Sequence, residues 1–422
     1  MRYFDYDQSE INRTSKIPYD NEPIARKTSS SGRGSNRGYV PNRTMTIMLA
    51  VIIGVNIILA YLVFRLTLSS GNVKAPVEIT YVIEGEDADT TYIASKAMPS
   101  AVCIASGYNS SVNEENINYQ NFQQMSDRGA GVIIDIDKTS GNATIITCEH
   151  VVSGNQDSIY ILIADSYIPI KATYIGGIRE KDIAVLKIYG SNEIKKSTAT
   201  KCEVADSSYV SYGNLVMAIG NPMSSGFDTS AGQIRKPQTL VTVTNIGVER
   251  VIATDVAINS GNSGGGLFNS RGELIGIVNA KIENVSIDNY SYAIPSNLAL
   301  SIAQSIENNN GIARKAVLGV EFGISSVGRE PQVVGGNVIY KDTISVEEVE
   351  SGSDAEKAGI KENDIILSFT YHNSKTVEML SMYSFEDHAY RINIGDKIIF
   401  TIKRNGSLIT IELVVSKVNW FM

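Results

Sequence analysis

The sequence is poor in cysteine, histidine and tryptophan, and each shortage removes a class of function. Its 422 residues include three Cys, three His and one Trp. No Cys lies in a CxxC pair or in a Cys/His cluster, so neither a dense disulfide framework nor a zinc finger is expected. A net charge of −8 and a pI of about 5.2 argue against a general nucleic-acid-binding protein. The length suits two or three domains.

The N-terminal part of the chain differs from the rest in composition. Residues 1–44 carry eight basic and five acidic side chains among many Ser, Gly and Asn, which predicts a disordered cytoplasmic tail. Residues 45–64 hold no charge and, as a helix of about 30 Å, would cross a bilayer. We expect an uncleaved membrane helix over residues 45–66, with a cleaved signal peptide as the alternative. The preceding basic residues would keep the N-terminus in the cytoplasm, and a linker over residues 67–95 would lead to extracytoplasmic domains of a cell-membrane protein.

Short apolar strands dominate residues 96–310. Segments rich in Val, Ile and Thr, such as SAVCIAS, NATIITCEH and DIAVLKI, are separated by Gly, Asn and Asp. They fall into two successive sets of about six, which predicts two barrels or a pair of sandwiches. A helix is expected at SNLALSIAQSIENN, with Ser296 as N-cap and Leu298, Ile302 and Ile306 on its apolar face.

Residues 316–422 are predicted to form a smaller α/β module. Strands are expected near LGVEFG, DIILSFT and KIIFTIKR, and short helices at SDAEKAG, which Gly359 would end, and at SFEDHAYRI. The expected fold class is therefore mainly β, with a domain of two barrels or two sandwiches followed by an α/β domain.

Three segments contain residues suited to nucleophilic catalysis. GNSGG places Ser263 among glycines whose amides can approach a substrate oxygen, His150 follows a β-rich segment, and Asp182 precedes another. Each has a purely structural alternative: a glycine-rich turn, a histidine at a strand end, and a turn aspartate. Together they supply an alcohol, a base and a carboxylate in the chain order His, Asp, Ser of chymotrypsin-type triads. His372 and His388 fall in the C-terminal module, which leaves His150 as the only histidine of the barrel domain.

Residues from about 96 to 420 resemble the HtrA (Deg-type) family, in which a trypsin-like serine protease domain precedes a PDZ domain. The resemblance rests on TCEHVV, DIAVLKI, IGNP, ATDVAINSGNSGGGLFN and SYAIPSN, in this order. It implies a chymotrypsin-like double β-barrel in a membrane-anchored serine endopeptidase. Such an enzyme would cleave unfolded or damaged exported proteins without a cofactor or metal, and would be a homotrimer.

The resemblance also implies roles for individual residues. Ser263 would attack the peptide carbonyl, His150 would act as general base and then general acid, and Asp182 would hold the imidazole tautomer. Backbone N–H groups of Gly261 and Ser263 would stabilise the oxyanion. The strand over residues 275–282 would pair with the substrate, and the implied substrate-binding residues are Val278, Asn279, Ala280 and Tyr290.

The C-terminal module resembles a PDZ domain. Backbone N–H groups of Leu318, Gly319 and Val320 would capture the carboxylate of a peptide C-terminus while the peptide adds as a strand. The alternative is a structural domain without a ligand.

The sequence departs from the family pattern beside the histidine, where Cys148 and Glu149 replace small amide-type residues. We expect Cys148 to pack inward as a small hydrophobe and Glu149 to face solvent from the opposite side of a strand. Cys103 and Cys202 could pair as a disulfide outside the cell.

Two other functions stay open. One is a membrane-tethered peptide-binding sensor without catalysis, against which the complete triad argues. The other is a serine esterase, which usually carries a GxSxG elbow on an α/β sheet in the order Ser, Asp, His; neither that order nor alternating helices appear in the sequence.

Overall fold

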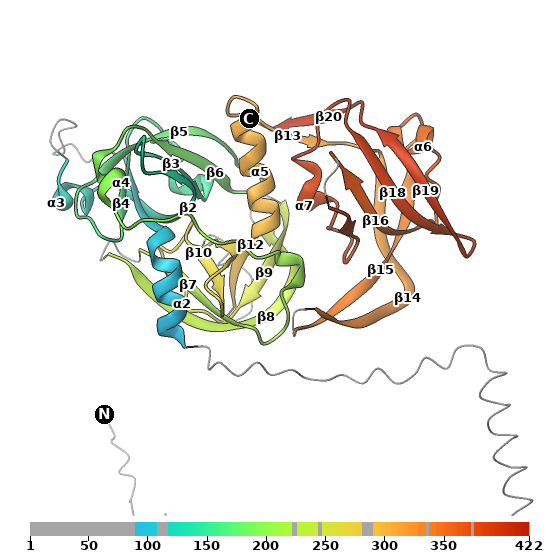
Figure 1. Cartoon of the computed structure of the whole chain (residues 1–422), viewed down its shortest axis with the longest axis horizontal. Helices are drawn as coiled ribbons and strands as arrows, with labels where there is room; N and C mark the ends of the chain where they lie inside the picture. Colours follow the sequence, from blue (N-terminus) through green and yellow to red (C-terminus); the bar gives the residue numbers. More distant parts are fainter. Residues whose placement is uncertain are drawn as a thin grey trace, which may run out of the picture. The chain divides into compact units, whose positions relative to one another are not determined.

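The protein is described by a computed structural model (Figure 1), which covers residues 89–107, 117–221, 226–243, 247–280, 290–334, 337–372 and 375–421. The predicted tail, membrane helix and most of the predicted linker (residues 1–88) lie outside these described residues. Within the described part of the chain, no helix has both the length and the apolar character needed to cross a membrane.

Two closed six-stranded β-barrels follow one another along the chain, which confirms the predicted pair of strand sets. The first has the strand order β1-β2-β3-β6-β5-β4 and the second β10-β11-β12-β9-β8-β7. The first barrel consists of β1 Ala101–Ser106, β2 Asp127–Asp137, β3 Asn142–Thr147, β4 Ile159–Ile163, β5 Ile170–Ile178 and β6 Ile183–Ile188. The second consists of β7 Leu215–Gly220, β8 Asp228–Val243, β9 Gly247–Thr254, β10 Gly266–Asn269, β11 Leu274–Val278 and β12 Ser291–Pro295.

A continuous hydrophobic core connects the barrels. β-Branched side chains such as Ile104, Ile145 and Ile161 fill the first barrel, as is typical of strands that face a barrel interior. The same cluster of buried residues includes Phe268 and Ile277 from the second barrel. The loops that leave the two barrels at this junction are therefore held by a shared core.

Short helices cover the barrels. They are α2 Thr90–Ala97, η1 Met98–Ser100, α3 Tyr119–Phe122, η3 Glu149–Val151, α4 Asn192–Lys196, η4 Ser207–Tyr209 and α5 Ser296–Asn308. The predicted linker over residues 67–95 overlaps α2, whose Ile93 is fully buried in the core.

Helix α5 occupies the predicted segment, and Leu298, Ile302 and Ile306 are buried as predicted. The prediction of Ser296 as its N-cap is wrong. Pro295 holds the cap position and Ser296 is the first helical residue, because the Ser296 hydroxyl donates to the carbonyl of Ala205 (3.2 Å) and not to the helix backbone.

The C-terminal α/β unit contains one main sheet of order β14-β15-β16-β18-β19, with β17 paired to β16. Its elements are β13 Ala313–Ala316, β14 Val320–Val334, β15 Asn337–Val349, α6 Asp354–Ala358, β16 Ile365–Tyr371, β17 Val377–Glu378, α7 Glu386–Ala389, β18 Lys397–Arg404, β19 Ser407–Val414 and β20 Val418–Phe421. Gly359 ends α6 at φ 86°, as predicted, because glycine takes this left-handed conformation without a steric penalty. The helix predicted at SFEDHAYRI is limited to the four residues of α7.

Candidate active site

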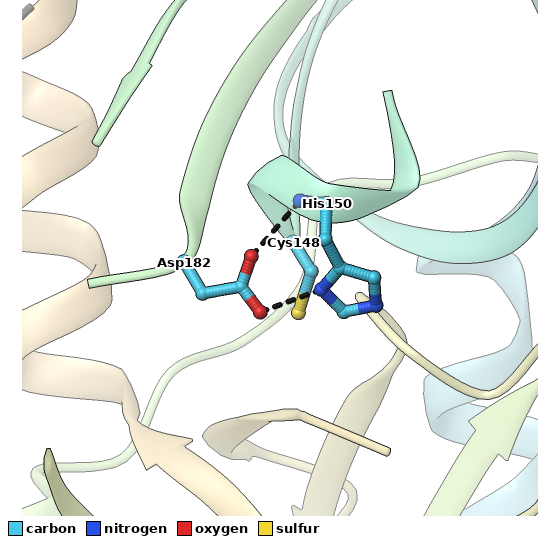
Figure 2. Close-up of side chains that lie close together, drawn as sticks. All are labelled: Cys148, His150 and Asp182. Carbon is cyan, nitrogen blue, oxygen red and sulfur yellow. Dashed lines mark hydrogen bonds and ion pairs between the residues drawn. The ribbon is translucent and has the colours of Figure 1, made fainter. Parts of the chain in front are cut away.

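His150 and Asp182 lie together at the end of the first barrel. His150 is in the 3₁₀ turn η3, which follows strand β3 as the sequence indicated. The Asp182 carboxylate bonds twice to this residue: Oδ2 lies 2.6 Å from Nδ1 of the imidazole, and Oδ1 accepts the His150 backbone N–H at 2.9 Å (Figure 2). The two contacts fix both the position and the orientation of the ring. An ionised carboxylate is an acceptor only, so Nδ1 carries the proton and Nε2 is the acceptor.

Asp182 itself is held by an unusual backbone and by the second barrel. Its φ of 50° lies in the left-handed region, which costs an L-residue other than glycine about 1–2 kcal/mol. The Asn279 amide Nδ2 donates to Oδ2 of Asp182 at 2.9 Å, and both side chains are buried. The sequence suggested that Asn279 binds substrate, but its side chain is directed to the carboxylate. No short-range pattern could reveal this contact, because 97 residues separate the two partners.

Ser263 lies in the loop between β9 and β10. Its Oγ accepts the backbone N–H of Ala280 at 3.2 Å, and its carbonyl accepts the N–H of Ala130 at 2.8 Å. The second bond ties the serine loop to β2 of the first barrel. Among the described residues, no hydrogen bond joins Ser263 Oγ to His150, and the serine hydroxyl is 3.2 Å from Ala280 N instead.

The glycines of GNSGG are explained by close packing. A methyl group on Gly264 would lie 2.1 Å from Thr147 Oγ1 and 2.3 Å from the carbonyl of Ala130, and one on Gly265 would lie 2.2 Å from the carbonyl of Ile219. Only hydrogen fits at these positions, so the serine loop can press against β2, β3 and β7.

Two backbone N–H groups of this loop are available as donors. Within the described residues, neither the Gly261 N–H nor the Ser263 N–H takes part in a hydrogen bond. Gly261 has a φ of 101°, and its carbonyl accepts the N–H of Asn221 (3.2 Å), which comes from the IGNP segment. This bond holds the Gly261 carbonyl against Asn221.

The other predicted substrate-binding residues lie on β11, just after it, or beside β12. Strand β11 lies between β10 and β12 and has no free edge over Leu274–Val278, so it cannot take up a substrate strand there. The Val278 N–H donates to Gly265 O and the Val278 carbonyl accepts the Gly264 N–H, both at 2.8 Å. Tyr290 packs near Tyr292, with 6.5 Å between the ring centroids. Residues 281–289 lie outside the described residues.

The cysteine predictions had different outcomes. Cys148 is fully buried, as expected, and its thiol donates to the carbonyl of Val278 (3.3 Å). Glu149, which was expected on the opposite face of a strand, belongs to the same 3₁₀ turn as His150. Cys103 and Cys202 are separate buried thiols, so the disulfide that the sequence left open is not formed. Burial raises the pKa of Cys202 to about 12.

Charged side chains surround Lys181, the residue before Asp182. Lys181 contacts Glu249 at 3.2 Å and Glu386 of α7 at 3.7 Å, and Lys315 contacts Glu386 at 2.8 Å. Burial raises the pKa of Glu386, but Lys315 and Lys181 outweigh it and hold that pKa at about 2. Beside them, the buried Arg250 pairs with Asp387.

The predicted peptide-binding residues begin the C-terminal unit. Leu318 is buried in its core, Gly319 has a φ of 69°, and Val320 is the first residue of β14, which is the edge strand of the sheet. Among the described residues, the N–H groups of Leu318 and Gly319 donate no hydrogen bond.

Comparison with known proteins agrees with this architecture. Residues 129–277 match the trypsin-like peptidase domain family. The serine protease Do-like HtrA of Lactococcus lactis subsp. lactis is 34% identical over 316 residues, which cover 70% of this chain and 72% of the relative. The chain belongs to the Do-like HtrA family of serine proteases.

Two further relatives support membership of the HtrA family. The serine endoprotease DegS of Haemophilus influenzae is 29% identical over 76% of this chain and 85% of its own length. The periplasmic pH-dependent serine endoprotease DegQ of Escherichia coli is 32% identical over 68% of this chain and 58% of its own length. The HtrA-type chain described here is a serine endopeptidase, which leaves the sensor and esterase alternatives without support.

Proposed function

We propose that Ser263, His150 and Asp182 are the catalytic triad of this endopeptidase. The observation that carries the proposal is the pair of bonds from Asp182 to His150, because they present an acceptor nitrogen, Nε2, on a ring that cannot rotate freely. The serine loop is bonded to the barrel that carries this pair through Ser263 O and Ala130 N. Rotation of the Ser263 side chain away from Ala280 would bring the hydroxyl to the imidazole when substrate binds, since such contacts often tighten only in the substrate complex.

The chemistry follows from these positions. Ser263 Oγ forms a bond to the carbonyl carbon of the peptide while its proton passes to Nε2 of His150. Nε2 then gives this proton to the leaving amine, and an acyl-enzyme remains. Water then attacks the acyl-enzyme while His150 takes its proton. The carboxylic acid product leaves, and Ser263 regains a proton from His150. Asp182 stabilises the imidazolium at each stage without being protonated.

The free N–H groups of Gly261 and Ser263 would receive the negative charge of the tetrahedral intermediate. Fixed backbone donors need no reorganisation during the reaction, and the loss of one donor costs about 10²–10³ in kcat in comparable sites. The glycine-rich loop therefore stabilises the transition state through donors that are already in place.

Labelling with a fluorophosphonate probe tests the nucleophile without knowledge of the substrate. The full-length protein should be labelled and should cleave unfolded casein, and Ser263→Ala should do neither, with a loss on the order of 10⁶ in kcat. Ser260→Ala, which changes an exposed serine of the same loop, is the matched control and should retain both. Equal labelling of Ser263→Ala and the wild type would refute the assignment.

The substrates proposed for the enzyme are unfolded or damaged exported proteins, met outside the cytoplasm by a protein anchored through residues 45–66. The uncharged stretch of residues 45–64 supports an anchor, and a family relative that is named periplasmic supports an extracytoplasmic site. Full-length protein should stay with the membrane after alkaline extraction, and a variant without residues 45–66 should be released. Light scattering of the detergent-solubilised chain tests the proposed homotrimer.

A PDZ-like role of the C-terminal unit is proposed for peptide C-termini. Support comes from the edge position of β14 and the two unused donors at Leu318 and Gly319. An extended peptide could add to β14 while these N–H groups take its carboxylate. A hydrophobic peptide should bind full-length Ser263→Ala at least tenfold more tightly with a free C-terminus than with a C-terminal amide; equal affinities would contradict carboxylate capture.

A further inference from the structure

A thiol lies beside the histidine–aspartate pair and has no part in the proposed catalytic cycle. Sγ of Cys148, a ring nitrogen of His150 and a carboxylate oxygen of Asp182 lie within 4.8 Å of one another. Figure 2 draws the sulfur next to the hydrogen bond that joins Nδ1 to Oδ2. The sequence did not predict this arrangement, because the carboxylate comes 32 residues after the histidine and the three residues do not match a known metal-binding motif.

We propose that Cys148, His150 and Asp182 form an inhibitory binding site for a thiophilic divalent cation of the Zn²⁺ class. Thiolate sulfur, imidazole nitrogen and carboxylate oxygen are the three ligand types that Zn²⁺ takes from proteins. The thiolate excludes Mg²⁺ and Ca²⁺, which prefer oxygen ligands. One thiolate and one carboxylate also neutralise the two charges of the cation, so the buried site holds no net charge and avoids the large cost of burying an ion.

The site needs a small adjustment to accept the cation. Zinc bonds of about 2.3 Å to sulfur and about 2.0–2.2 Å to nitrogen and oxygen would separate tetrahedral ligand atoms by roughly 3.4 Å. The present Nδ1–Oδ2 distance is 2.6 Å, so this pair must open. Once the cation replaces the Nδ1 proton, the bond from Nδ1 to Asp182 no longer holds the ring, and the His150 side chain, which is 22% exposed, can turn toward solvent while the buried Cys148 and Asp182 stay in place. The exposed side would supply water as the fourth ligand.

Binding of the cation redistributes two protons. The Cys148 thiol proton leaves to water as the sulfur becomes a thiolate. Nδ1 of His150 gives up its proton to bind the metal, and Nε2 takes up one, so the neutral ring changes tautomer. The net result is the release of one proton to solvent.

The change of tautomer predicts inhibition. Nε2 then carries a proton and cannot accept the one from Ser263, so the general base is lost while the fold is kept. This consequence rests on the triad proposed above, whereas the binding site itself rests only on the three neighbouring ligand atoms.

A zinc titration of the full-length protein tests the inhibition. Casein cleavage by each variant is expressed relative to its own activity in chelator. Zn²⁺ should inhibit the wild type at least tenfold and reversibly, and Cys148→Ala should need at least ten times more Zn²⁺ for the same effect. Cys202→Ala removes another buried thiol and should behave as the wild type. Inhibition of Cys148→Ala and the wild type at the same Zn²⁺ concentration would overturn the site.

A second measurement is independent of activity. Full-length Ser263→Ala is titrated with Cd²⁺, and the ultraviolet thiolate-to-cadmium band is recorded together with thermal unfolding. One equivalent should produce the band, and Ser263→Ala/Cys148→Ala should lack it while it remains folded. A band that persists in the double variant would place the metal elsewhere and overturn the proposal. If the Cys148-dependent band forms but Zn²⁺ leaves the wild type active, the metal site stands and the inhibition that rests on the proposed triad is refuted.

Discussion

The two barrels have the same number of strands and contribute different kinds of atoms to the site. The first barrel supplies side chains, His150 and Asp182, which extend from a 3₁₀ turn and from a residue with positive φ. The second supplies Ser263 and, around it, backbone groups that depend on glycine. A side chain can be exchanged without moving the chain, but a backbone donor is lost only when the chain itself moves. Substitutions of the first barrel's catalytic side chains should therefore affect the chemistry alone, and substitutions of the glycines around Ser263 should affect the fold as well.

Among substitutions of residues around the serine, Asp182→Asn should have the largest effect. An amide at this position can present its NH₂ group to Nδ1 and select the wrong imidazole tautomer, so kcat should fall by about 10⁴. Casein cleavage measures this loss, and cooperative thermal unfolding near the wild-type temperature shows that the fold survives. A loss of less than tenfold would remove Asp182 from the triad.

Gly264→Ala disturbs the close packing of the serine loop against the first barrel. The methyl group would contact Thr147 Oγ1 and Ala130 O in a residue with a φ of 83°, so the free energy of unfolding should fall by about 3–5 kcal/mol. Urea unfolding measures this loss in free energy, and the Ser263→Ala background prevents self-cleavage during the experiment. Gly154 has the same φ but nothing within 4 Å of the added carbon. Gly154→Ala should therefore cost only about 1 kcal/mol, and equal costs for the two variants would show that packing is irrelevant.

The ion pairs beside Asp182 stabilise the first barrel to an extent that depends on pH. The packing around the glycines does not depend on pH. The folded-state pKa of Glu386, about 2, is below its ordinary value of 4.5. Its contribution is therefore present above pH 4.5 and lost as the pH falls toward 2, by about 3 kcal/mol in total. Urea unfolding between pH 5 and 2 should show a shallower loss for Glu386→Gln than for the wild type. Parallel curves for the two proteins would contradict this pairing.

Asn279→Ala should have the smallest effect, since it removes one donor to a carboxylate that keeps its two bonds from His150. A hydrogen bond to a charged group is worth about 1.5–3 kcal/mol, so kcat/KM should fall about 10- to 100-fold. Asn259→Ala, an exposed amide on the serine loop, is the matched control. An unchanged kcat/KM for Asn279→Ala would show that the second barrel does not help to position Asp182.

The sequence predicted some parts of the site well because they are local. GNSGG can be recognised in five residues, and the strand sets follow from short segments rich in Val, Ile and Thr that are separated by Gly, Asn and Asp. The first turn of α5 was misplaced by one residue because Ser296 bonds to Ala205, which lies 91 residues away. The bond from the Asn279 side chain to Asp182 was not predicted for the same reason, since its partner belongs to the other barrel.

The sequence by itself determined the class of enzyme: the segments around His150, Asp182 and Ser263 can each be recognised within a few residues, and their order along the chain is that of chymotrypsin-type triads. Only the tertiary structure decided which atoms meet. Closure of two barrels on a shared core brings the Asn279 amide and the Cys148 thiol to within reach of one carboxylate and one ring. The physical reason is that hydrogen bonds and metal coordination act over about 2–3 Å, a distance that chain spacing cannot specify.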